Sequence, residues 1–145
     1  MSHRIATTGI HQKGLRRKRI LPTAEGQRRP RERDAKHMAC IAILPCTICG
    51  SRPVHVAHVR MADLDHCKPY TGKGEKPSDR WTLPLCPDCH VNGPDAQHKS
   101  NEAAWWTRHG IDPIALCIKL YEASGDLELM ERIILSVDGT VVERT

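Results

Sequence analysis

The sequence contains no phenylalanine and, among 145 residues, only three tryptophans and two tyrosines. So few large side chains build only a small core, and small domains of this kind often depend on a staple such as a structural metal ion. No run approaches the roughly 18 apolar residues of a membrane-spanning helix. The N-terminal segment also lacks the apolar centre of a signal peptide. We therefore expect a cytoplasmic protein without a membrane partner.

In a reducing cytoplasm, seven cysteines that include two CxxC pairs favour metal binding over disulfides. The pairs are Cys46/Cys49 and Cys86/Cys89, with 36 residues between them. Zinc prefers four thiolates in a closed tetrahedral structural site. The spacing therefore predicts one structural Zn²⁺ and a folded segment inside the long gap. The alternative is that these are buried or free thiols.

Positive charge is concentrated near the N-terminal end. Residues 1–34 hold ten of the 22 lysines and arginines and three of the 17 acidic residues, a net charge of +7, and the remainder has a net charge of −2. The basic runs contain Gly and Pro without apolar periodicity, which is typical of a flexible arm. Such an arm would bind DNA phosphates, and a solubilising tail is the alternative. Its candidate DNA-binding residues are Arg16, Arg17, Lys18, Arg19, Arg28 and Arg29.

Short helices and strands are expected after the arm. Asp34 is suited to cap a helix over residues 35–44, which Pro45 ends. Residues 54–59 alternate β-branched side chains and predict a strand, and residues 81–85 are expected to lead, extended, into the second CxxC pair.

Two helices are expected in the C-terminal half. Ser100 would cap a helix that stops at Gly110, and Asp112 would begin another that runs to about residue 124. Asp138-Gly139 between β-branched residues predicts a hairpin near the end. These elements indicate a small α+β protein with an arm (1–34), a folded domain (35–125) and a C-terminal extension (126–145).

Some side chains in these helices are expected to be core residues. Trp105 and Trp106 are adjacent and point about 100° apart on a helix, so at least one faces the core, and we favour the core for both over base stacking. Cys40 and Cys117 lie among apolar residues and are expected there as well.

Histidines remain after four thiolates fill the zinc coordination sphere. His90 directly follows the second CxxC pair, His98 comes eight residues later, and His58 lies on the expected strand. On one unbroken helix His90 and His98 would be about 12 Å apart along the axis, too far to share an ion. Asn92-Gly93-Pro94 is a strong chain breaker, so a bend can bring them together. His55 is a weaker partner for His58, because a separation of three puts them on opposite strand faces.

Longer motifs connect these features. A histidine ending a strand between two CxxC pairs, followed by LPLCPDCH, resembles the zinc-containing HNH (ββα-metal) nucleases. The sequence resembles more closely the phage-borne HNH nucleases of the Ref type, a RecA-dependent family. Those show a similar order: an LPC..CG turn, an AHVR-like strand, a glycine loop similar to TGKGEKPSDRW, then LPLCPDCH, QH, NE and HGIDP. The motifs cover about Leu44 to Pro113, roughly half of the chain, and their combination is more specific than any one of them.

The resemblance implies a role for each remaining histidine. His58 would be the general base, and His90 and His98 would bind a catalytic Mg²⁺ or Mn²⁺. Phosphodiester hydrolysis needs an activated water, a cation for the developing charge and help for the leaving oxygen, and these groups would supply the first two.

Two positions depart from the family pattern. Ala57 stands where many HNH enzymes have an acidic or histidine metal ligand, and Trp81 stands where the middle asparagine is expected. Asp79 is a further candidate for either role. The glycine loop adds three candidate DNA contacts, with a plain surface loop as the alternative: Lys73, Lys76 and Arg80.

The sequence therefore predicts an HNH-type, metal-dependent DNA endonuclease or nickase, a hydrolase of phage recombination or DNA processing. The resemblance implies a phage- or prophage-encoded protein in the bacterial cytoplasm, with DNA and a recombinase filament such as RecA as partners. One alternative is a non-catalytic zinc protein that binds DNA or assists recombination. Another is a zinc protein-interaction module that does not bind DNA.

Overall fold

The computed structural model describes residues 30–72 and 74–137, and the described residues from Arg31 onward form one compact unit. Its elements give the small α+β class that the sequence predicts. Within the described ranges, no helix is both long enough and apolar enough to cross a membrane. The elements in chain order are α2 (Ala35–Ala42), β1 (His55–His58), β2 (Thr82–Leu85), a π-helical turn η1 (Asp88–Asn92), a 3₁₀ turn η2 (Gln97–Lys99), α3 (Glu102–Arg108), α4 (Pro113–Glu122) and α5 (Leu127–Val137).

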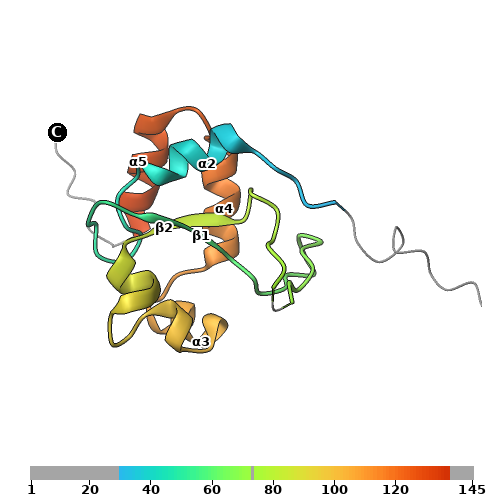
Figure 1. Cartoon of the computed structure of the whole chain (residues 1–145). Coiled ribbons are helices and arrows are strands. Elements are labelled where there is room, and N and C mark those ends of the chain that lie inside the picture. Colours follow the sequence, from blue (N-terminus) through green and yellow to red (C-terminus); the bar gives the residue numbers. More distant parts are fainter. Residues whose placement is uncertain (1–29, 73, 138–145) are drawn as a thin grey trace, which may run out of the picture. The chain divides into compact units, whose positions relative to one another are not determined.

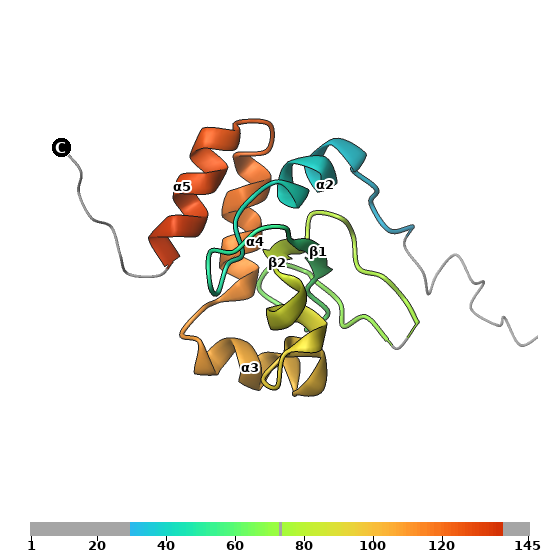
Figure 2. The same cartoon turned by 60° about the vertical axis from the view of Figure 1, so that its left-hand side comes forward.

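β1 and β2 form a two-stranded antiparallel sheet at the centre of this unit. The register pairs His55 with Leu85 and His58 with Thr82. All four residues of β2 are buried, because α2 and α4 both pack against this strand. In both views α2 lies above the sheet and α3 below it, and α4 passes alongside the strands (Figures 1 and 2).

The core combines the sheet with one face of each helix. Trp105 and Trp106 each have 1% of their surface exposed, and Cys117 has none, so the prediction that these residues are core is confirmed. Cys40 is half-buried and packs against the same cluster. Other large apolar side chains in the core include Ile41, Leu44, Leu83, Leu85, Ile114, Leu120, Met130 and Ile134.

Most helix starts are those expected from local capping chemistry. The carboxylate of Asp34 accepts the backbone N–H of His37, and that of Asp112 accepts the N–H groups of Ile114 and Ala115. The prediction that Ser100 caps the next helix is wrong by one residue. The side chain of Asn101 accepts the N–H of Ala104 instead and so starts α3.

The C-terminal extension begins with a helix. α5 packs against α4 and places Met130 and Ile134 in the common core, so its apolar residues follow a helical spacing. Residues 135–137, the upstream side of the expected hairpin, belong to this helix. The expected turn at Asp138-Gly139 lies outside the described residues.

The residues just before α2 pack on the folded unit, although their charge placed them in the arm. The backbone carbonyl of Glu32 accepts the N–H of Asp79 at 2.9 Å, and the N–H of Asp34 donates to Asp79 Oδ2 at 2.9 Å. The Glu32 N–H also donates to the Ser78 hydroxyl at 3.0 Å. The arm residues 1–29 lie outside the described residues.

Candidate metal centre and catalytic cleft

Four cysteine sulfurs meet where β2 ends. The Sγ atoms of Cys46, Cys49, Cys86 and Cys89 all lie within 4.8 Å of one another. Zinc–sulfur bonds of about 2.3 Å hold tetrahedral sulfurs about 3.8 Å apart. The 3.5 Å between the sulfurs of Cys49 and Cys86 is close to that value. The group therefore fits one structural zinc ion, as the spacing of the two CxxC pairs predicts.

Local backbone geometry prepares both pairs for the metal. In the first, Gly50 has a φ of +73° and its N–H donates to the carbonyl of Cys46, a left-handed turn that suits glycine. In the second, the N–H of Cys89 donates to the sulfur of Cys86 at 3.4 Å. Each CxxC pair therefore lies in a turn stabilised by its own hydrogen bond.

The thiols differ in how readily they ionise. Burial would raise the pKa of Cys49, but hydrogen bonds with the hydroxyl and backbone of Ser51 and with neighbouring thiols lower it to about 7. Burial raises the pKa of Cys46 and of Cys89. Four thiolates this close repel one another, so full deprotonation requires a bound cation.

His58 lies at the end of β1 and is held by a buried carboxylate. Its Nε2 lies 3.2 Å from Oδ1 of Asp79, which is 4% exposed. Burial lowers the pKa of His58, and the hydrogen bond with Asp79 opposes this only in part. Burial would raise the pKa of Asp79, but the N–H of Asp34 and the ring of His58 hold it below its usual value. A neutral imidazole thus faces an ionised carboxylate.

This contact distinguishes between the two roles considered for Asp79. One oxygen bonds His58 and also lies 3.5 Å from the guanidinium of Arg31, and the other accepts the N–H of Asp34. With both oxygens engaged, Asp79 is placed to orient His58. Its role as a metal ligand remains a prediction without support from these contacts.

A cleft of about 480 Å³ opens beside His58. It is lined by residues that follow β1, by the glycine loop and by the segment from η2 to the start of α3, so three separate parts of the chain build it. Glu102 ties two of its walls together, because its carboxylate accepts the N–H of Arg60 and the side-chain amide of Gln97. The lining residues are His58, Arg60, Gly74, Gln97, His98, Ser100 and Glu102.

His98 lines this cleft and contacts His90, the residue that directly follows the last of the four cysteines. The ring centroids of His90 and His98 are 4.4 Å apart, so the chain break at residues 92–94 does bring the two imidazoles together. His90 is anchored by its N–H, which donates to the carbonyl of Cys86 at 2.9 Å. Its side chain therefore projects from the second CxxC pair toward His98.

Gly93 makes the reversal between these histidines possible. A Cβ at this position would lie 2.6 Å from the backbone oxygen of Asp88, a contact that real structures do not tolerate. The N–H of Gly93 donates to that same oxygen at 2.8 Å and closes η1. Only a residue without a side chain allows so close a return of the chain.

His90 also contacts His55, which the sequence interpretation did not select. Their Nδ1 atoms are 3.0 Å apart, and the ring centroids are 5.2 Å apart. Burial, followed by the neighbouring rings of His98 and His55, lowers the pKa of His90 to about 4. His90 is therefore neutral at physiological pH, which is the form of an imidazole that binds a metal.

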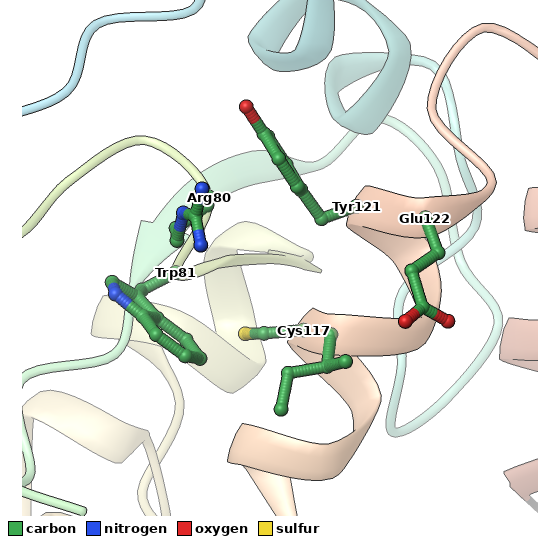
Figure 3. Close-up of a pocket in the computed structure, with 6 residues that line it drawn as sticks. Arg80, Trp81, Cys117, Tyr121 and Glu122 are labelled. Carbon is green, nitrogen blue, oxygen red and sulfur yellow. The ribbon is translucent and has the colours of Figure 1, made fainter. Parts of the chain in front are cut away.

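The predicted DNA contacts of the glycine loop have different surroundings. Arg80 turns away from the cleft: it pairs with Glu32 at 2.7 Å and lies 4.8 Å from the ring centroid of Tyr121. There it lines, with Trp81 and Cys117, a second pocket of about 130 Å³ between the start of β2 and α4 (Figure 3). Lys76 is exposed to solvent.

The remaining predicted DNA contacts lie outside the described residues. They are Lys73 in the glycine loop and Arg16, Arg17, Lys18, Arg19, Arg28 and Arg29 in the arm.

The two departures from the HNH pattern are both core residues. Ala57 is 1% exposed and Trp81 is 8% exposed. The buried ammonium group of Lys68 lies over the ring of Trp81, 5.7 Å from the ring centroid. The hydroxyl of the next residue, Thr82, donates to the carbonyl of Asp79 at 2.8 Å and closes the turn before β2.

The sequence interpretation missed two residues of the candidate site, Arg60 in the cleft and His55 beside His90. Arg60 lines the cleft with His58, and its position two residues later on an extended chain is the signal that places both on one face. His55 is opposite Leu85, the residue before Cys86, so only the register of the sheet reveals it.

Comparisons of the chain with protein-family models, curated proteins and solved structures gave no match. The four-thiol group and the histidine-lined cleft are therefore the features that support a functional proposal.

Proposed function

We propose that this protein is a metal-dependent DNA endonuclease or nickase of the HNH (ββα-metal) type. The observation that carries the proposal is the cleft that His58 shares with His98, whose ring contacts His90 beside the four-thiol group. A base and a pair of nitrogen ligands are components that phosphodiester hydrolysis needs. The order β1, β2, η1 supports the ββα-metal class, with η1 as a single turn in place of a longer helix.

His58 acts as the general base in this proposal. An ionised Asp79 can only accept, so the proton of the neutral ring sits on Nε2 and the lone pair on Nδ1 is free. That nitrogen takes a proton from the attacking water, and Asp79 stabilises the resulting imidazolium. A pKa below the ordinary value of 6.5 keeps His58 in its basic form at neutral pH.

His90 and His98 hold the catalytic ion. A bound divalent cation stabilises the charge that develops on the phosphate and on the leaving oxygen. The backbone bond to Cys86 fixes His90, so the structural zinc centre positions one ligand of the catalytic site. Loss of the zinc would therefore also remove the catalytic ion.

Positive groups along the cleft bind the DNA backbone. Arg60 is half-buried in the cleft wall, and Lys76 is exposed on the loop that follows Gly74. Arg80 is paired with Glu32, so its contribution to phosphate binding is smaller than its charge suggests. The arm adds a sequence-independent electrostatic contribution to affinity.

A plasmid assay tests the activity. The full-length protein should convert supercoiled plasmid to nicked circles or linear DNA when Mg²⁺, Mn²⁺, Co²⁺, Ni²⁺ or Zn²⁺ is supplied, and EDTA should stop it. The same series with RecA-coated single-stranded DNA tests the recombinase partner. Absence of cutting with every ion, with and without RecA, would contradict the nuclease proposal.

Removal of residues 1–29 should weaken DNA binding and leave the fold intact. The cut spares Glu32 and Asp34, which bond Asp79 and so support His58. Fewer released counterions should flatten the dependence of log K on log salt concentration, measured by fluorescence anisotropy. Arg132→Gln, on the exposed surface of α5, is the control that changes charge elsewhere. An unchanged salt slope after truncation would show that the arm is a solubilising tail.

One observation favours a second function, a non-catalytic zinc protein that binds DNA or assists recombination. In the described part of the chain, the four thiols are the only preformed group of metal-ligating atoms. Such a protein binds DNA and loses that binding with its zinc, but it never cuts. The plasmid assay separates the two functions.

A further inference from the structure

His55, His90 and His98 form a cluster of three contacting histidines. The proposed chemistry uses His90 and His98 but not His55. His55 opens β1, and its partner in the register is Leu85, the residue before Cys86. His90 follows Cys86 by four residues and is tied back to it by a backbone hydrogen bond. The sheet register and the turn of the second CxxC pair thus bring His55 and His90 to the same point from different directions.

The three imidazoles are arranged with His90 in the middle. Nδ1 of His55 is 3.0 Å from Nδ1 of His90, and the ring of His98 lies 4.4 Å from that of His90 on a centroid basis. Two nitrogens bound to one zinc-like ion at about 2.0–2.1 Å in tetrahedral geometry are about 3.4 Å apart. The His55–His90 pair is therefore close to the separation that a shared ion requires.

The chemistry around the cluster selects a class of metal. The contacts that define the cluster are between imidazoles: His90 contacts the ring of His55 and the ring of His98. Glu102, which also lines the cleft, is occupied by Arg60 and Gln97. Imidazole nitrogens suit Zn²⁺, Co²⁺ and Ni²⁺, whereas Mg²⁺ requires oxygen ligands.

We infer that His55 is the third protein ligand of a metal site formed with His90 and His98, and that this site takes Zn²⁺, Co²⁺ or Ni²⁺ in preference to Mg²⁺. The inference rests on the proposed function in that His90 and His98 there hold the catalytic ion. Many HNH enzymes have a metal ligand at the position of Ala57. In the inferred site His55, at the start of the same strand, takes the place of that ligand. His98 also lines the cleft, so an ion held here borders the space beside His58.

Closure of the site requires small side-chain movements. The rings contact one another in pairs, and their ligand atoms do not form a preformed group like the four thiols. His55 and His98 are both exposed. Exposed side chains change rotamer within nanoseconds, so the outer two rings can turn onto an ion that His90 has bound.

Metal titration of the full-length protein tests this inference. Protein with one zinc per chain, verified by elemental analysis, is titrated with Co²⁺ or Ni²⁺ by calorimetry. The wild type should take up one further equivalent, and millimolar Mg²⁺ should not displace it. His55→Ala should weaken this second binding at least about tenfold while the first zinc and the melting temperature stay unchanged.

His66→Ala is the matched control. His66 is also an exposed histidine, but its ring pairs with Asp63 outside the cluster. This variant should bind the second ion as the wild type does. Paramagnetic shifts of the imidazole N–H protons on Co²⁺ binding provide an independent readout, and they should report three histidines in the wild type and two in His55→Ala.

Several results would overturn the inference: no second equivalent in the wild type, equal second-site affinity in His55→Ala, or displacement by Mg²⁺. If the wild type nicks plasmid and His55→Ala still binds the second ion normally, His55 is not a ligand. The nuclease proposal is then unaffected. A second ion that depends on His55 in a protein that never cuts DNA would support this metal site and remove the nuclease.

Discussion

Cys86→Ser should release zinc from the protein and unfold it. Cys86 lies between β2 and η1, its sulfur is 3.5 Å from that of Cys49, and its carbonyl accepts the N–H of His90. The apparent binding free energy of a structural zinc site is about 10–16 kcal/mol, which equals or exceeds the net stability of about 5–15 kcal/mol of a typical domain. A chain with a core this small cannot replace such a contribution with packing.

Elemental analysis and thermal melting measure this outcome. The variant should contain less than one zinc per chain and lose its cooperative transition, and the wild type treated with a strong chelator should behave in the same way. Cys67→Ser is the matched control, because Cys67 is exposed and lies outside the four-thiol group. Full zinc content with unchanged melting in Cys86→Ser would disprove the zinc assignment.

Local features of this fold were predictable because neighbouring residues determine them. The caps at Asp34 and Asp112 depend on side-chain bonds to N–H groups two or three residues away. The two CxxC turns and the break at residues 92–94 are equally local. Each of these features therefore forms without depending on contacts with distant parts of the chain.

Contacts between distant segments were not predictable in the same way. The contact of His55 with His90 depends on the register of the sheet, and Arg80 meets Glu32 across 48 residues of sequence. A charge pattern shows that Arg80 is basic, but not that an acidic partner neutralises it. The apolar spacing of residues 127–137 is helical, whereas the Asp138-Gly139 turn signal predicts a hairpin, and the sequence alone does not decide between the two.

The candidate site combines both kinds of information. Motif order selected His58, His90 and His98, and the structure brings His90 and His98 together while placing His58 and His98 on one cleft. The supporting residues Asp79, Arg60 and His55 come into place only through tertiary contacts. For this reason, side chains that orient or complete a site are harder to recognise from sequence than those that carry its motif.

His58→Ala should reduce DNA cleavage by at least about two orders of magnitude, the lower end of what a general base contributes. Zinc content and DNA affinity should remain near wild type, because His58 is assigned to neither. Removal of the ring leaves a buried carboxylate, Asp79, with one partner fewer. His58→Gln is therefore needed as well, because its amide can still donate to Asp79 but cannot accept a proton as an imidazole does.

Single-turnover cleavage of supercoiled plasmid, with filter binding and thermal melting in parallel, measures these effects. His90→Ala should also be inactive, but through loss of the ion, so high Mn²⁺ or Co²⁺ should restore part of the rate. No metal concentration should rescue His58→Gln. His66→Ala should cut like the wild type.

The dependence of cleavage on pH gives a further test of the base. Burial lowers the pKa of His58 below the ordinary 6.5, so the neutral, active form persists below that pH. The wild-type rate should therefore fall only as pH drops through this lowered value. The folded state also binds this proton less readily than the unfolded state, so the part of the stability that depends on His58 should decline as pH falls below about 6.5.

A packed strand residue would behave differently from a base. If His58 only supported the fold, His58→Ala would lose stability, DNA binding and cleavage together, and His58→Gln would recover all three through its bond to Asp79. The base role predicts instead that His58→Gln recovers stability and binding while cleavage stays at least about a hundredfold down. A variant of His58 that cuts at a near wild-type rate would rule out this mechanism.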